Sequence, residues 1–191
     1  MAKIGVLSLQ GAVSEHLAQV KRCGAEAAAV KRPADLEELD GLIIPGGEST
    51  TIGNLMEQFG LNRAITARFG KGMAIFGTCA GMVLLAKEIL DGVQDQPRLA
   101  LMDIKVRRNA FGRQKESFEA PVSVKGFDTP VTGVFIRAPI ITEAGDRVEA
   151  LATVPEGIAA ARQGKLLTTA FHPELTDDLR VHRYFIEICR S

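Results

Sequence analysis

The sequence predicts a three-layer α/β fold: a mostly parallel central sheet with helices on both faces and an antiparallel extension. In residues 1–90, short apolar segments alternate with amphipathic segments of helical period, which is typical of a parallel sheet. In residues 101–171, strand-like segments follow one another across glycine turns, which indicates antiparallel pairing. Two apolar segments of the first half end in turns at Gly46 and Gly77, at the sheet edge where ligands of such folds gather.

The length and composition fit one globular domain, which we expect to span residues 1–191. Hydrophobic residues make up 46% and charged residues 24% of the chain. The formal net charge is +0 and there is no basic block, so nothing indicates a nucleic-acid surface. No apolar run approaches the length of a membrane span.

The N-terminus and the cysteines indicate a cytoplasmic protein. The first residues pass directly into a strand pattern and lack the features of a signal peptide. The cysteines Cys23, Cys79 and Cys189 are odd in number and far apart, which argues against a disulfide framework or a zinc site. We expect Cys23 and Cys189 to be structural and unreactive.

The first half is predicted to hold four β-α units. The strands are expected at residues 3–9, 25–30, 41–44 and 73–76. The helical segments are expected at residues 12–23, 35–39, 52–59, 62–69 and 80–87. In the first helix, Val13, Leu17 and Val20 form the apolar stripe. His16 lies off this stripe, so we expect it on a solvated face.

The second half is predicted to be mainly antiparallel. Strands are expected at residues 101–106, 120–124, 131–136 and 147–154, followed by a hairpin of residues 157–162 and 165–171. A C-terminal helix is expected to start at Asp177 or Asp178. Its apolar residues predict an inward face, and His182 is expected on the outer face.

Cys79 lies in a turn that suits a nucleophile. It is flanked by Gly77 and Gly81, between the apolar segment 73–76 and the predicted helix. A strand, a sharp glycine turn and a helix form the nucleophile elbow known with serine. The helix start favours thiolate over thiol. The alternative is that Cys79 is a small buried residue, because free cysteines are commonly buried.

A base for this thiol is available at the end of another apolar strand. His172 is followed by Pro173 and Glu174, and a proline disfavours helical geometry in the residue before it. In an extended chain, residues i and i+2 project to the same side, so Glu174 is expected to orient the His172 imidazole. The alternative is a helix-entry turn in which Glu174 only stabilises the following helix.

Two backbone N–H groups are candidates for an oxyanion hole. One belongs to Ala80, next to Cys79, and the other to Gly47, in the turn after strand 41–44. The alternatives for this turn are an ordinary connection or a phosphate site, although the lysine of a Walker motif is missing. Ser49 or Thr50 is expected to cap the helix that follows.

Two arginines are candidates for substrate binding. Arg108 lies in the polar segment 107–114 and could bind a carboxylate with two hydrogen bonds. Arg137 follows Ile136 at the end of a predicted strand. For both, a solvated loop is the alternative.

Seven segments of the chain, in one order, resemble the class I glutamine amidotransferases. Within that family the chain is similar to the glutaminase subunits of pyridoxal 5′-phosphate synthases, and segment 108–114 carries this closer likeness. Residues 91–98 match no family segment. The matching segments are residues 9–12 (Leu-Gln-Gly-Ala), 45–51 (Pro-Gly-Gly-Glu-Ser-Thr-Thr), 77–81 (Gly-Thr-Cys-Ala-Gly), 108–114 (Arg-Asn-Ala-Phe-Gly-Arg-Gln), 117–119 (Ser-Phe-Glu), 135–139 (Phe-Ile-Arg-Ala-Pro) and 171–176 (Phe-His-Pro-Glu-Leu-Thr).

The resemblance implies a flavodoxin-like fold and a Cys-His-Glu triad of Cys79, His172 and Glu174. It implies hydrolysis of L-glutamine to L-glutamate and ammonia through a thioester on Cys79, with no metal or cofactor. The ammonia would pass to the synthase, a ring of (β/α)8 barrels that makes pyridoxal 5′-phosphate (vitamin B6). The resemblance also places six residues around the glutamine: Gly47, Glu48, Ser49, Arg108, Ile136 and Arg137.

Three other functions remain open from the sequence. The same triad could serve another synthase, such as imidazole glycerol phosphate synthase, although segment 108–114 argues against this. A non-catalytic regulatory subunit could retain the fold, and a cysteine hydrolase or peptidase could act alone.

Overall fold

The computed structural model describes residues 1–92, 95–112 and 117–191. The helical elements are α1 (Val13–Arg22), η1 (Pro33–Leu36), α2 (Ser49–Gln58), α3 (Leu61–Gly70), α4 (Ala80–Leu85), η2 (Pro173–Leu175) and α5 (Arg180–Arg190). The strands are β1 (Lys3–Leu7), β2 (Glu26–Val30), β3 (Gly41–Ile44), β4 (Ala74–Thr78), β5 (Ala86–Ile89), β6 (Met102–Arg107), β7 (Ser117–Val122), β8 (Val131–Ile136), β9 (Ile140–Ala144), β10 (Glu149–Val154), β11 (Gly157–Gln163) and β12 (Leu166–Thr169).

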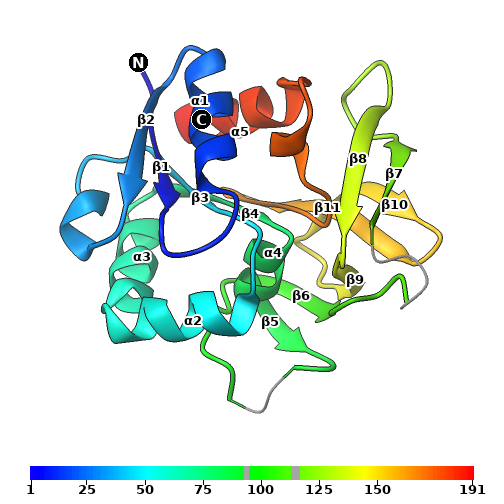
Figure 1. The fold of residues 1–191 in the computed structure, drawn as a ribbon, viewed down its shortest axis with the longest axis horizontal. Coiled ribbons are helices and arrows are strands. Elements are labelled where there is room, and N and C mark those ends of the chain that lie inside the picture. The colour runs from blue at the N-terminus through cyan, green and yellow to red at the C-terminus, as the bar shows by residue number, and fades with distance from the viewer. Residues whose placement is uncertain (93–94, 113–116) are drawn as a thin grey trace.

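The first half of the chain forms the parallel part of the main sheet, in the order β2-β1-β3-β4-β12 (Figure 1). β12 comes from the end of the chain and lies beside β4, with Thr169 paired to Thr78. Parallel strands present their carboxyl ends at one edge of a sheet. The residues that follow β4 and β12, which include Cys79 and His172, therefore start from neighbouring positions.

The antiparallel extension continues the same sheet. β11 pairs with β12, β9 with β11 and β6 with β9, all antiparallel, and β5 adds a parallel edge strand. β7 and β8 form a separate two-stranded sheet. The sequence leaves open whether the second half extends the sheet or packs beside it, and the structure does both.

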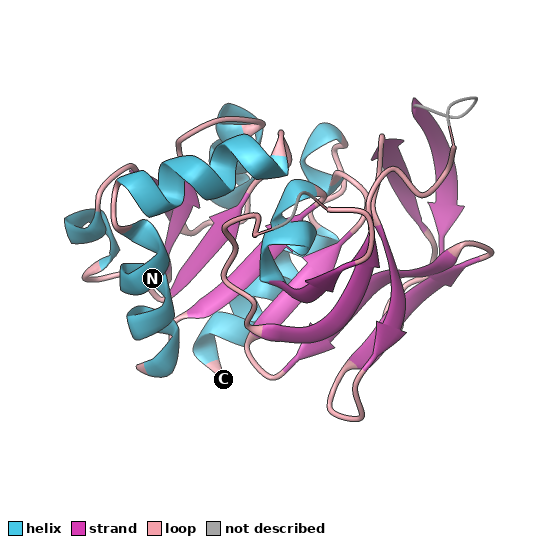
Figure 2. Cartoon of the chain, turned by 90° about the horizontal axis from the view of Figure 1, so that it is seen from below, coloured by secondary structure: helices cyan, strands magenta, loops and turns pink. Residues whose placement is uncertain are grey.

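Helices cover both faces of the parallel part, as predicted. α1 and α5 lie side by side on one face, and α2 and α3 lie on the other (Figures 1 and 2). The strands between them are apolar: all residues of β3 and β4 are buried. Such double burial is typical of parallel strands and explains their unbroken apolar runs. Among the described residues, no helix is long and apolar enough to cross a membrane.

The C-terminal helix α5 begins at Arg180, with Leu179 as its N-cap, and not at Asp177 or Asp178 as predicted. Two other elements differ in kind from the prediction. The helix expected at 80–87 ends at Leu85, and Ala86–Ile89 forms β5, because Ala86 takes an extended conformation and its segment pairs with β6. The strand β9 was not predicted. Its apolar core is only Ile140 and Ile141, too short a run to show a period.

The helix cap in the turn after β3 also differs from the prediction. The N-cap of α2 is Glu48, not Ser49 or Thr50. The Glu48 carboxylate accepts hydrogen bonds from the backbone N–H groups of Thr50 and Thr51, at 3.2 and 2.7 Å. A carboxylate at this end also meets the positive end of the helix dipole. Burial is the largest single influence on Glu48 and opposes its ionisation, but these hydrogen bonds together lower its pKa.

Candidate active site

Cys79 lies in a strained turn between β4 and α4. Its backbone angles are φ 49° and ψ −101°, a conformation that is rare for a residue with a side chain. The neighbouring glycines allow the turn to pack tightly. A Cβ added to Gly77 would touch the backbone of Gly81, and one added to Gly81 would touch the carbonyl oxygen of Ile44. The turn therefore has the compact geometry expected of a nucleophile elbow.

His172 lies beside Cys79 because β12 lies beside β4. The His172 N–H donates to the carbonyl oxygen of Val134 at 2.8 Å, which ties this segment to β8. Its imidazole lies beside the Cys79 side chain, since a Cβ added to Gly46 would meet both, and the Cys79 thiol raises the pKa of the imidazole. Nδ1 of the imidazole lies 2.7 Å from Oε1 of Glu174. His172 thus has neighbours in Cys79 and Glu174, and the Glu174 carboxylate is buried.

The chain reaches this arrangement by a turn rather than by the extended geometry that we expected. Pro173, Glu174 and Leu175 form the 3-10 turn η2, and His172 is its N-cap residue. The sequence allowed two alternatives, a Glu174 that orients the imidazole and a helix-entry turn, and the structure combines both. The segment is a helical turn, and Glu174 nevertheless contacts the imidazole.

The pKa of His172 is raised from its ordinary value to about 10. Burial opposes the charged imidazolium, but the hydrogen bonds and charges of Cys79 and Glu174 outweigh it. The arrangement therefore favours an imidazolium at neutral pH, which is the partner that a thiolate nucleophile needs.

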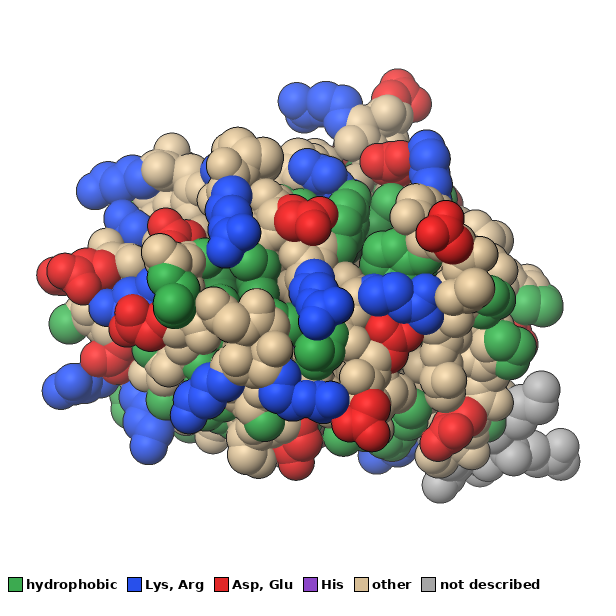
Figure 3. Space-filling view, turned by 90° about the horizontal axis from the view of Figure 1, so that it is seen from above, with side chains coloured by type: hydrophobic (Ala, Val, Ile, Leu, Met, Phe, Trp, Pro, Cys, Tyr) green, Lys and Arg blue, Asp and Glu red, His purple; other side chains and the backbone are tan. Residues whose placement is uncertain are grey.

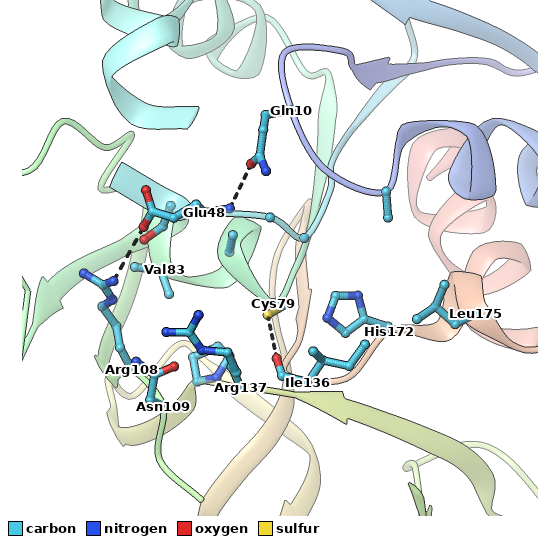
Figure 4. Close-up of a pocket in the computed structure, with 16 residues that line it drawn as sticks. Gln10, Glu48, Cys79, Val83, Arg108, Asn109, Ile136, Arg137, His172 and Leu175 are labelled. Carbon is cyan, nitrogen blue, oxygen red and sulfur yellow. Dashed lines mark hydrogen bonds and ion pairs between the residues drawn. The ribbon is translucent and has the colours of Figure 1, made fainter. Parts of the chain in front are cut away.

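A cavity of about 430 Å³ opens in front of Cys79 (Figure 4). Every residue predicted for the oxyanion hole or the substrate site lines it, together with Cys79 and His172. Glu174 does not line it and lies behind His172. The lining residues from those predictions are Gly47, Glu48, Ser49, Ala80, Arg108, Ile136 and Arg137.

Polar contacts hold one wall of the cavity. The backbone N–H of Glu48 donates to Oε1 of Gln10 at 2.8 Å, and the Glu48 carboxylate lies 3.6 Å from the Arg108 guanidinium (Figure 4). On the opposite wall, Sγ of Cys79 lies 3.8 Å from the carbonyl oxygen of Ile136. Arg113 and Gln114, the last two residues of segment 108–114, lie outside the described residues.

Backbone strain is concentrated at this cavity. Among the described residues other than glycine, five have a positive φ, and three of these line the cavity. They are Cys79, Asn109 and Arg137, with φ values of 49°, 44° and 45°. Such conformations cost energy and are typical of functional sites, where the surrounding structure holds them.

The predictions for His16 and His182 were wrong. Both were expected on solvated faces, but their exposed fractions are 0% and 1%. The face in Figure 3 shows interspersed acidic and basic side chains and no histidine. The buried stripe of α1 is His16, Gln19 and Val20, because η2 and α5 cover this helix on a side that its apolar pattern does not reveal.

Two more residues of the site were not predicted individually. Gln10 belongs to a segment that resembles the family, but no role was predicted for it from the sequence. In the structure its Oε1 accepts a hydrogen bond from the backbone N–H of Glu48 and so stabilises that turn. Asn109 lies next to Arg108 in the cavity wall. A polar residue directly after the first strand was the available signal for Gln10, since ligand sites gather at strand ends.

Among the described residues, no group of three or more His, Cys, Asp or Glu side chains is arranged to hold a metal ion.

Solved structures identify the class of this fold. A crystal structure of a glutamine amidotransferase matches with a TM-score of 0.93 and 49% identity, over 98% of this chain and 99% of the other. A putative GMP synthase component from Thermoplasma acidophilum matches with a TM-score of 0.72 at 21% identity, over 100% of this chain and 95% of the other, which speaks for the fold alone. The sheet, its helical layers and the turn at Cys79 are those of the class I glutamine amidotransferase fold, as predicted.

The family follows from the sequence comparison. A model of the SNO glutamine amidotransferase family matches residues 6–191. The chain belongs to this family, so the prediction of a glutamine amidotransferase is confirmed. Among its relatives are proteins named pyridoxal 5′-phosphate synthase subunit PdxT. That of Geobacillus kaustophilus is 55% identical over 99% of this chain and 95% of its own length. That of Parafrankia sp. is 55% identical over 99% of this chain and 94% of its own length.

Proposed function

We propose that this chain is the glutaminase subunit of a pyridoxal 5′-phosphate synthase. It hydrolyses L-glutamine to L-glutamate and ammonia as a single cytoplasmic domain of residues 1–191. The family and the names of the relatives support this proposal. The observation that carries the chemistry is the contact of His172, which lines the cavity beside Cys79, with the Glu174 carboxylate buried behind it. The test is glutamate release from L-glutamine, measured with and without the synthase subunit of the same organism, and its absence in both would refute the proposal.

The triad would act in two half-reactions. The Cys79 thiolate attacks the side-chain amide carbon, and the N–H groups of Gly47 and Ala80 receive the developing oxyanion. The His172 imidazolium then protonates the amide nitrogen, ammonia leaves and a glutamyl thioester remains on Cys79. A water molecule, deprotonated by His172, attacks the thioester and releases glutamate and the thiol. Glu174 orients the imidazole through the bond at Nδ1.

The charged groups of the cavity wall would bind the amino-acid end of glutamine. Among the described residues, the Arg108 guanidinium pairs with the Glu48 carboxylate at 3.6 Å, and the Arg108 side chain is 24% exposed. A guanidinium in this position can bind the substrate carboxylate, while the carboxylate of Glu48 can face the ammonium group. Ser49, Ile136 and Arg137 complete the proposed site.

We expect Arg108→Ala to raise the KM for glutamine about tenfold to a hundredfold while kcat changes little. The reason is that a hydrogen-bonded charge pair to the substrate carboxylate contributes about 1.5–3 kcal/mol in both the ground state and the transition state. Steady-state kinetics of glutamate release measure both constants. Arg63→Ala, at an exposed position on α3, is the matched control. A lower kcat at an unchanged KM would remove Arg108 from substrate binding.

The mouth of the cavity is the proposed docking face for the synthase. Ile136 and Leu175 line the cavity, yet they are 37% and 44% exposed. Large apolar side chains beside a catalytic cavity are suited to contact a partner protein. We propose that the partner is the ring of (β/α)8 barrels and that it covers this mouth. Ammonia released at Cys79 would then pass into the partner rather than into solvent.

We expect Gly46→Ala to lower glutaminase kcat about a hundredfold or more. A Cβ at Gly46 would touch Cε1 of His172 and lie 3.3 Å from Cβ of Cys79, so the imidazole has to move. Small misplacements of reacting groups cost about two orders of magnitude. Gly70→Ala is the matched control, because a Cβ there meets no atom within 4 Å. Activity of Gly46→Ala equal to that of Gly70→Ala would contradict the proposed arrangement.

A further inference from the structure

Behind the proposed triad lies a second group of buried polar side chains. It consists of His16 from α1, His182 from α5, Thr78 from β4 and the outer oxygen of Glu174. Nδ1 of His16 lies 2.9 Å from Nε2 of His182. Nε2 of His16 lies 3.1 Å from Oγ1 of Thr78 and 3.4 Å from Oε2 of Glu174. All four residues are at most 4% exposed, so none of them can rely on bulk water for hydrogen bonds.

The outer carboxylate oxygen of Glu174 is the unsatisfied member of this group. Oε1 is bound to His172, whereas Oε2 has no aligned hydrogen bond among the described residues. Nε2 of His16 lies 3.4 Å from this oxygen. Leaving a buried carboxylate oxygen without a donor is costly, and the positive end of an N–H dipole on Nε2 of His16 would lower that cost even without full alignment.

Burial favours the neutral form of both histidines. Burial lowers the pKa of His16 well below its usual value, and the nearby His182 and His172 lower it further. Burial lowers the pKa of His182 to about 4. The single negative charge of Glu174 already faces the imidazolium of His172, so a second cation beside it would lack a counter-charge. Each neutral imidazole carries one N–H, and its position remains to be assigned.

Two tautomer patterns satisfy the contact between His16 and His182. In the first, Nε2–H of His182 donates to Nδ1 of His16, and Nε2–H of His16 points at Thr78 and Glu174. In the second, His16 donates from Nδ1, so its bare Nε2 lone pair faces the carboxylate. The second pattern also leaves an N–H at Nδ1 of His182, which has no partner among the described residues. A buried N–H without an acceptor is rarer than an unfilled acceptor, so both contacts favour the first pattern.

We propose that His16, held in the Nε2–H tautomer by His182, is a positioning residue that donates toward Oε2 of Glu174 and keeps this carboxylate aimed at His172. The inference rests on the proposed catalytic role of Glu174. His16 would act on the reacting atoms through Glu174 and His172. Outer partners of this kind at metal sites commonly cost about tenfold to a hundredfold in activity when they are lost. Two helices distant in the sequence would thereby fix one oxygen of the triad.

The tautomers can be read directly in the free chain. Protein labelled with ¹⁵N-histidine is examined by long-range ¹H–¹⁵N correlation NMR, and the signals of His16 and His182 are assigned by their loss in His16→Gln and His182→Gln. We expect both histidines to be neutral and protonated on Nε2. A proton on Nδ1 of His16, or a charged His16 at pH 7, overturns the proposal. This measurement needs no glutaminase activity, so it remains decisive if the proposed function fails.

A matched pair of variants tests the positioning role. His16→Leu removes the donor, and His16→Gln places an amide N–H near the position of Nε2. In the complex with the synthase, we expect His16→Leu to lower kcat about tenfold to a hundredfold with KM within about twofold, and His16→Gln to recover most of the loss. Equal losses in both variants would assign His16 to packing and overturn the proposal, as would wild-type kcat in His16→Leu. If His16→Leu does not fold, the glutamine variant and the NMR measurement decide.

Discussion

Cys79→Ala is expected to lower glutamate release from L-glutamine by about six orders of magnitude, the scale found when a nucleophile is removed from a triad. The reason is that no thioester can form without the thiol, and the remaining N–H groups and base then act only on water. The measurement is single-turnover glutamate release in the presence of the synthase. Binding to the synthase, followed by sedimentation, is expected to be unchanged because Cys79 is only 8% exposed.

The other cysteines provide matched controls. Burial raises the pKa of Cys23, and it raises the pKa of Cys189 to about 12, so neither thiol is poised to react at neutral pH. We expect Cys23→Ala and Cys189→Ala to keep kcat within about twofold, since neither residue lines the cavity. If Cys79→Ala retained the turnover of these controls, the chemistry proposed for the cavity would be wrong.

The sequence was sufficient for the fold because its signals are local. The unbroken apolar runs of β3 and β4 belong to strands buried on both faces, and the segments between them carry the helical period. Placing Cys79 and His172 at strand ends then predicted their meeting, since carboxyl ends of parallel strands share an edge. The structure brings them together through the pairing of β4 with β12.

The parts that were missed depend on contacts between distant segments. The pattern of α1 indicates one buried stripe, but η2 and α5 cover a further side of this helix and enclose His16. The sequence pattern of residues 12–23 does not indicate that η2 and α5 bury this further side. Similarly, β5 forms because the chain after Leu85 meets β6, although its residues continue a helical pattern. Local pattern therefore singled out Cys79 and His172 but not the residues behind them.

His172→Asn is expected to lower glutaminase kcat by about four to five orders of magnitude. Asparagine keeps a donor near Nδ1 but has no titrating group, so it can neither form the imidazolium nor protonate the departing ammonia. The pKa of about 10 means that the wild-type imidazolium is present at pH 7 and is lost as the pH rises through about 10. Alkylation of Cys79 by iodoacetamide at pH 6, followed by mass spectrometry, is therefore expected to be slower in the variant. Equal alkylation rates in the wild type and the variant would show that His172 does not activate the Cys79 thiol.

The double variant Cys79→Ala/His172→Asn tests whether the two residues act as one unit. Independent contributions would multiply, so the double variant would be slower than the wild type by the product of the two losses, and slower than Cys79→Ala by the loss seen in His172→Asn. A nucleophile and its base instead share one step, and removing either already abolishes that step. We therefore expect the double variant to release glutamate no more slowly than Cys79→Ala alone. A further loss of several orders of magnitude would mean that His172 serves a reaction that does not pass through Cys79.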